Sequence, residues 1–135
     1  MTKIVDAMGG VTSYTFDHQG NMTSVKDALG NITLYSYDVL GHQTKVTYAD
    51  GTCISNQYDA RGNKIKTVYA DGTASLCSYD ESKNLIKEIM PDGSFIEYQY
   101  DLLNERISEK GANGSIIKYE YYPNGNMSMM LRDDL

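Results

Sequence analysis

The stretch from Tyr58 to Ser78, YDARGNKIKTVYADGTASLCS, decides the fold of this chain. Two turn signals divide it. The first, Asp59-Ala60-Arg61-Gly62, has Asp at the first turn position and Gly at the last, which favours a type I turn. The second is Asp71-Gly72, a hairpin signal, because glycine adopts positive φ without a Cβ clash. The runs 63–69 and 73–79 alternate and favour β-branched or aromatic residues, so we predict two strands.

The same unit recurs every 21 residues in both directions. Aromatic-Asp pairs stand at Phe16-Asp17, Tyr37-Asp38, Tyr58-Asp59, Tyr79-Asp80 and Tyr100-Asp101, and the next step, Tyr121-Tyr122, loses the Asp. A fixed period of this length indicates one supersecondary unit copied in tandem. We therefore predict structural repeat roles, in turns or in packing, for Tyr37, Asp38, Gly41, Gly51, Tyr58, Asp59, Gly62, Gly72, Tyr79, Asp80, Gly93, Tyr100, Asp101, Gly114 and Tyr121.

These signals predict an all-β fold of tandem 21-residue β-hairpins. The glycines that recur every 21 residues, such as Gly51, Gly72, Gly93 and Gly114, leave no long stretch free of glycine. Helix is therefore nearly excluded, and we expect a meander of about 12 antiparallel strands. Pro91 and Pro123 each suit the second position of a turn, where the fixed φ is an advantage. At about 4.8 Å per strand the sheet would span roughly 60 Å, and wide twisted sheets curl. We expect it to coil into a tube or shell, or to pack on a second copy.

Residues 1–135 are predicted to form a single array. The period already runs at the first residue, because Met1 corresponds to Met22 one repeat later. At the other end, Leu135 stands one repeat after Gly114. The 135 residues hold about 6.4 repeats, cut mid-repeat at both ends, which is typical of a piece of a longer array.

Side chains alternate between the two faces of a strand, so the pattern also assigns faces. One face is predicted to collect eleven of the 12 tyrosines in three columns: Tyr37, Tyr58, Tyr79, Tyr100 and Tyr121; Tyr14, Tyr35, Tyr98 and Tyr119; and Tyr48 and Tyr69. The opposite face is predicted to carry Lys45, Lys66 and Lys87, with Ser36, Gln57, Ser78, Gln99 and Glu120. The tyrosines could serve cross-strand packing, stack on a glycan, or do both; a tyrosine at every repeat on the more apolar face favours packing.

Composition excludes several classes of function. The formal charge of −6 and a pI near 4.7 argue against nucleic acid or an anionic membrane as partners. No apolar run is long enough to span a membrane, and no signal peptide opens the chain. Cys53 is two residues after the recurring Gly51, and Cys77 is five residues after Gly72. Because side chains alternate along a strand, the two cysteines are placed on opposite faces, which argues against a disulfide.

No catalytic residue, cofactor site or metal site is predicted. The aspartates recur at equivalent turn positions instead of converging on one cleft, and no phosphate loop or zinc motif is present. Turn capping explains these aspartates better than cation binding does, because the dense ligand spacing of an EF-hand is missing.

The recurring Tyr-Asp-x-x-Gly with a later Asp-Gly resembles the YD repeat of Rhs proteins, similar to repeats in Tc-toxin shell components and teneurins. The resemblance covers the whole chain and is best at Tyr58 to Asn63; it weakens where Lys83, Asn104 and Tyr122 replace the expected Gly or Asp. It implies a β-sheet ribbon that spirals into a hollow shell. In bacterial members the shell encloses a C-terminal toxin, and the repeats are not catalytic. The Asp-Pro-x-Gly-Leu motif of the family's autoproteolytic site is absent from this sequence.

The resemblance leads to a structural hypothesis: the chain is part of an encapsulating shell of a secreted or cell-surface protein. Its partners would be the rest of that shell and the enclosed toxin. A second hypothesis is a carbohydrate- or cell-surface-binding module that uses the tyrosines. We also expect self-association through edge strands or the apolar face, since unpaired strand edges invite pairing.

Overall fold

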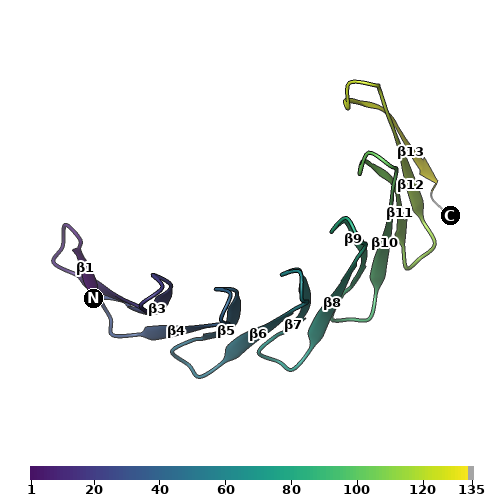
Figure 1. Ribbon diagram of the computed structural model, residues 1–135. Helices are drawn as coiled ribbons and strands as arrows, with labels where there is room; N and C mark the ends of the chain where they lie inside the picture. The colour runs from purple at the N-terminus through teal and green to yellow at the C-terminus, as the bar shows by residue number, and fades with distance from the viewer. Residues whose placement is uncertain (134–135) are drawn as a thin grey trace. The chain divides into compact units, whose positions relative to one another are not determined.

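The computed structural model describes residues 1–133; the last two residues of the predicted array, Leu135 among them, lie outside the described part. Thirteen strands follow one another in sequence order in an antiparallel sheet, one more than the approximate number predicted (Figure 1). The described residues contain no helix, and the predicted all-β meander is confirmed. The strands are β1 Thr2–Val5, β2 Val11–Phe16, β3 Met22–Lys26, β4 Ile32–Tyr37, β5 Gln43–Thr47, β6 Cys53–Tyr58, β7 Lys64–Val68, β8 Ala74–Tyr79, β9 Leu85–Ile89, β10 Phe95–Tyr100, β11 Arg106–Gly111, β12 Ile116–Tyr121 and β13 Met127–Asp133.

The two turn signals produce one turn geometry. In the first kind of turn, Gly62 N–H donates to the Asp59 carbonyl over 3.1 Å; in the second, Gly72 N–H donates to the Tyr69 carbonyl over 3.0 Å. Both are four-residue turns that end on a residue with positive φ, which is 84° at Gly62 and at Gly72. The turn at Asp71-Gly72 therefore starts two residues before the sequence signal. Pro91 stands second in its turn, as predicted, because Gly93 N–H donates to the Met90 carbonyl.

Cross-strand register confirms the predicted faces where it can be followed. Tyr35 lies opposite Val46 on one side of the β4–β5 pair, and Ser36 lies opposite Lys45 on the other. The register shifts at the last strand residue before several of these turns, for example between Ser36 and Tyr37 and between Ser78 and Tyr79. Such a bulge leaves one backbone group without a ladder partner. Cys53 and Cys77 are both free thiols.

The chain divides into two compact units, which we describe separately. Unit 1 is Met1–Gly62 with Thr67–Gly72, and unit 2 is Asn63–Lys66 with Thr73–Leu135. Among the described residues only Val46 is buried, with 8% of its surface exposed. The strands thus form a layer without a thick core, and the stability of each unit depends on strand pairing, turns and contacts between neighbouring side chains.

Among residues 1–133, no helix is long and apolar enough to cross a membrane.

Candidate functional site

The tyrosine that recurs every 21 residues from Tyr37 to Tyr121 donates its hydroxyl to a backbone carbonyl fifteen positions earlier. The bonds run from Tyr37 Oη to Met22 O at 2.9 Å, Tyr58 to Gln43 at 2.9 Å, Tyr79 to Lys64 at 3.0 Å, Tyr100 to Leu85 at 2.8 Å and Tyr121 to Arg106 at 2.6 Å. Each accepting residue is the first residue of the preceding strand, and Met22, Gln43, Leu85 and Arg106 lie opposite a bulge. The hydroxyls therefore satisfy carbonyls of the previous repeat and link one repeat to the next.

Two of the tyrosine rings are also covered by neighbours. In unit 1 the His42 ring stacks on Tyr58 with centroids 4.8 Å apart and planes 22° apart. In unit 2 the Arg106 guanidinium lies 4.3 Å from the centre of the Tyr98 ring. A sugar ring needs an open aromatic face, so these contacts favour packing over ligand stacking at both positions.

The aspartates of the Tyr-Asp pairs cap the turns that follow them. Asp17 Oδ1 accepts the backbone N–H of Gln19 and of Asn21, each at 2.9 Å, and Asp38 does the same for Leu40 and His42. A hydrogen bond from the Asn21 amide, together with these backbone donors, lowers the pKa of Asp17 below its usual value. Such side chains replace the missing backbone partners of a turn, so this chemistry is structural.

In the other kind of turn the cap is the first residue at Asp6 and Asp27, and the third residue at Asp50 and Asp92. Asp50 Oδ1 accepts the N–H of Thr52 at 2.9 Å and its hydroxyl at 2.6 Å, and Asp92 does the same for Ser94. The turn after Tyr121 has lost its Asp and uses this second arrangement, because Asn124 Oδ1 accepts the N–H of Asn126 at 3.1 Å. The Pro-Asn-Gly sequence therefore preserves the reversal with a cap from another position.

An aspartate–histidine pair in unit 1 resembles the orienting half of a catalytic triad. His42 Nδ1 lies 2.9 Å from Asp38 Oδ2. One repeat earlier, Asn21 Nδ2 donates to Asp17 Oδ2 at 3.0 Å, and in unit 2 Asn84 makes the same bond to Asp80. His42 thus occupies the place of an asparagine and makes the asparagine's bond. The pair holds a turn, and the sequence offers no signal of a nucleophile beside it.

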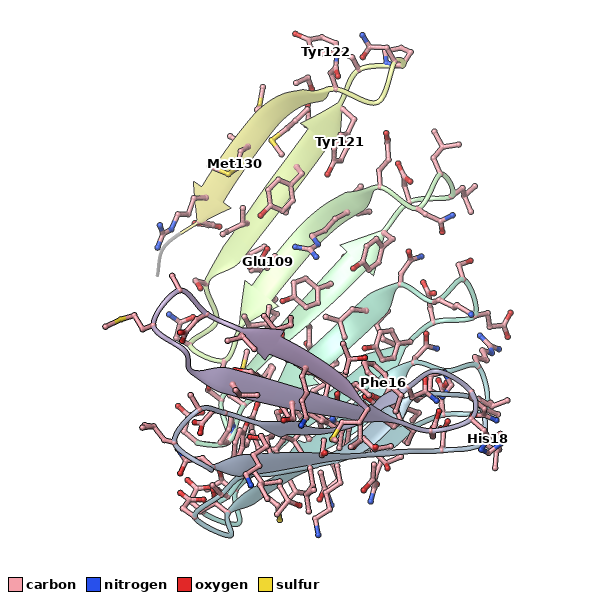
Figure 2. The ribbon with its side chains drawn as sticks, turned by 90° about the vertical axis from the view of Figure 1, so that its left-hand side faces the viewer. Phe16, His18, Glu109, Tyr121, Tyr122 and Met130 are labelled. Atoms are coloured by element: carbon pink, nitrogen blue, oxygen red, sulfur yellow. The ribbon has the colours of Figure 1, made fainter. Side chains whose placement is uncertain are left out.

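Unit 2 contains the strongest departures from the repeat. Lys83 and Asn104 stand where other turns have Gly, with φ of 67° and 63°. Glu105 takes the column of Asn21 and Asn84, and desolvation together with the nearby Asp101 carboxylate raises the pKa of Glu105. On β11, Glu109 accepts the Tyr119 hydroxyl at 3.0 Å and lies 3.6 Å from Arg106 Nη1. Figure 2 shows Glu109 and Tyr121 on the same side of β11 and β12.

A hollow of about 500 Å³ lies in unit 2, near the turns that follow β8 and β10. Its lining combines aromatic, acidic and amide side chains: Tyr98, Tyr100, Asp80, Asp101 and Asn104. Within the described residues, no group of three or more His, Cys, Asp or Glu side chains could hold a metal ion.

A family model described as "RHS Repeat" matches residues 1–32 and 16–52. The chain is a YD/RHS-repeat array. The array is similar to the crystal structure of TcdB2-TccC3-Cdc42, with a TM-score of 0.71 and 26% identity over 87% of this chain. It is also similar to the structure of TcdB2-TccC3 without its hypervariable C-terminal region, with a TM-score of 0.68 and 27% identity over 82% of this chain.

The array spans only 6–7% of the length of those solved chains. No curated protein sequence matches it. The RHS-repeat assignment agrees with the geometry, because the recurring Tyr bonds to the repeat before it and the recurring Asp caps its own turn.

Proposed function

We propose that this RHS-repeat array is a non-catalytic segment of the β-sheet wall of an Rhs-like protein, and that this wall encloses a C-terminal toxin domain. The parent protein would be secreted or displayed at a cell surface. The partners of the array would be the neighbouring repeats of the same wall and the enclosed domain.

The tyrosine bonds carry this proposal. In five successive repeats the hydroxyl of the recurring tyrosine bonds to a carbonyl of the repeat before it. The recurring aspartates are likewise occupied by backbone N–H groups of their own turns. The recurring Tyr and Asp residues thus extend a sheet repeat by repeat, as a wall requires. Their polar groups are occupied by these bonds and are not available for catalysis. The likeness to TcdB2-TccC3 structures supports the same proposal.

The test uses the full-length protein that contains this array. We expect its C-terminal domain to resist a protease that digests the same domain expressed alone. Cross-links should also join that domain to lysines of the array. A C-terminal domain cleaved equally fast in both forms would contradict the proposal. Light scattering of the array at micromolar concentration tests the separate expectation of self-association, which a monomer at every concentration would refute.

A glycan-binding role is the second candidate, and the hollow in unit 2 is the feature that favours it. Tyr100 with Asp80, Asp101 and Asn104 offers an aromatic surface beside polar groups, a combination that suits sugars. Glycan-array screening of the chain and of Tyr100→Ala would test it. Binding that Tyr100→Ala removes and Tyr48→Ala leaves intact would support recognition at the hollow; no binding by the chain would exclude it.

A further inference from the structure

The strands of unit 1 carry an unexpected charge pattern. Strands β1 to β6 contain three charged side chains, and all three are lysines: Lys3, Lys26 and Lys45. The whole chain has a formal charge of −6, so these strands oppose the overall sign. All three lysines are exposed, and none forms an ion pair with a carboxylate within residues 1–133.

Register places the three lysines on one face, opposite the tyrosines. Lys3 lies across from Ser13, which lies across from Lys26 on its other side, and Lys45 lies across from Ser36 and Ser55. We call this side of β1 to β6 the lysine face; it includes Lys3, Val5, Val11, Ser13, Thr15, Ser24, Lys26, Ile32, Leu34, Ser36, Lys45, Thr47, Cys53 and Ser55.

The lysine face contains a hollow of about 330 Å³ lined by Met1, Lys3, Ser13, Thr15, Ser24, Lys26 and Ile32. Thr15 Oγ1 lies 2.8 Å from Thr23 Oγ1 and 2.6 Å from Ser24 Oγ. Each of the three hydroxyls has one proton to donate, and the two hydrogen bonds between them use two of these protons. One O–H group is therefore left to donate to a group outside the cluster. That proton, with two ammonium groups beside it, suits an anionic acceptor such as a carboxylate.

Apolar side chains lie between the lysines. Ile32 is opposite Lys26 and Leu34 is opposite Ser24, and they are 43% and 49% exposed. The face has no aromatic residue among its members, so bases or sugar rings would find no stacking surface. A matching ligand therefore presents carboxylates and aliphatic groups side by side.

The turns restrict the width of that ligand. Every turn from β1 to the end of β6 contains an aspartate: Asp6, Asp27 and Asp50 at one end of the strands and Asp17, Asp38 and Asp59 at the other. Strands of this length measure roughly 15–20 Å, about two Debye lengths at physiological salt. A broad anionic surface such as a membrane would meet both rows of aspartates, whereas an extended polypeptide can lie between them.

We propose that the lysine face of unit 1 binds an extended acidic polypeptide segment in which pairs of carboxylate side chains alternate with pairs of aliphatic side chains. Successive side chains of an extended segment point to opposite sides, so paired Glu and Val positions can meet the lysines and the Ile32–Leu34 surface. This interaction is independent of whether the array encloses a toxin.

The test measures fluorescence anisotropy of a labelled 12-residue peptide of alternating Glu-Glu and Val-Val pairs, titrated with the complete chain. The double variant Lys26→Gln/Lys45→Gln should raise the Kd roughly threefold to tenfold, in line with the strength of exposed ion pairs. The matched control is Lys110→Gln/Lys118→Gln, which removes the same charge from exposed lysines of unit 2. Thermal unfolding of both variants verifies that they fold.

Added NaCl should weaken binding to the parent chain, because the charges are exposed. The proposal would be overturned by equal losses in the two double variants, or by equal binding of a peptide with Gln in place of Glu. It would also be overturned if phosphatidylserine vesicles bound the chain and displaced the peptide, since a membrane surface would then be the ligand.

Discussion

Units 1 and 2 share the backbone hydrogen bond of their turns and the tyrosine bonds, but their strands differ in charge. Strands β1 to β6 carry lysines alone, whereas unit 2 pairs opposite charges, with Lys87 Nζ 2.9 Å from Glu97 and Arg106 3.6 Å from Glu109. On the tyrosine side, the column that holds Val46 in unit 1 holds Glu88 and Glu109 in unit 2. The 21-residue repeat therefore determines the positions of the turns and of the recurring tyrosines. The residue type at other strand positions, including its charge, differs between the two units.

The largest expected effect comes from moving the acidic residue of unit 2 into unit 1. Val46→Glu places a carboxylate at the one buried position among residues 1–133, 8% exposed, and should lower the free energy of unfolding by about 3 kcal/mol. The reverse change, Glu88→Val, should alter it by less than about 0.5 kcal/mol. Urea unfolding followed by circular dichroism measures both. Equal effects would mean that this column is equivalent in the two units.

The second comparison concerns positive φ. Gly72→Val in unit 1 should cost about 1–2 kcal/mol, because φ is 84° and a Cβ there would meet nothing within 4 Å, so the strain lies in the backbone alone. Lys83→Gly in unit 2 should instead stabilise by up to about 1 kcal/mol, since Lys83 already holds a φ of 67°. Thermal unfolding of both variants checks the opposite signs. A destabilised Lys83→Gly protein would show that the lysine side chain makes a compensating contact.

The tyrosine bonds provide the third comparison. Tyr58→Phe removes the hydroxyl that donates to Gln43 O at 2.9 Å and should cost about 1 kcal/mol. Tyr48→Phe is the matched control, because Tyr48 is 42% exposed and its hydroxyl bonds to no described residue. The same urea titration distinguishes them. If the two variants lost equal stability, the hydroxyl–carbonyl bond would not be what links the repeats.

The smallest expected effect depends on pH. Desolvation and Asp101 raise the pKa of Glu105, so the folded protein prefers the protonated acid, and its ionisation costs stability as pH rises through that pKa. Glu105→Asn restores the residue found at Asn84, which donates to Asp80 Oδ2 at 3.0 Å. The variant should therefore have a higher Tm than the parent at pH 7 and no advantage at pH 3. A gain that persisted unchanged at pH 3 would contradict this electrostatic cause.

Much of the fold follows from the sequence because its determinants are local. A glycine that accepts positive φ, an aspartate that caps its own turn and a two-residue alternation all act within a few positions, so turns, strands and faces could be predicted from the 21-residue period. The same locality explains why a turn at Pro123 could be predicted although the aspartate after Tyr121 is missing.

Only the tertiary structure decided which distant groups meet. The partner of each tyrosine hydroxyl is fifteen residues away and depends on the bulge that shifts the register. The pattern predicted packing for these tyrosines and missed the hydrogen bonds. The position of Thr15 and Ser24 beside Lys3 and Lys26 likewise requires strands to be paired before the side chains come together. The sequence alone is enough to predict the repeating hairpin, because its turns and its side-chain alternation depend on neighbouring residues. The contacts between distant side chains depend on the register of paired strands, which only the folded sheet establishes.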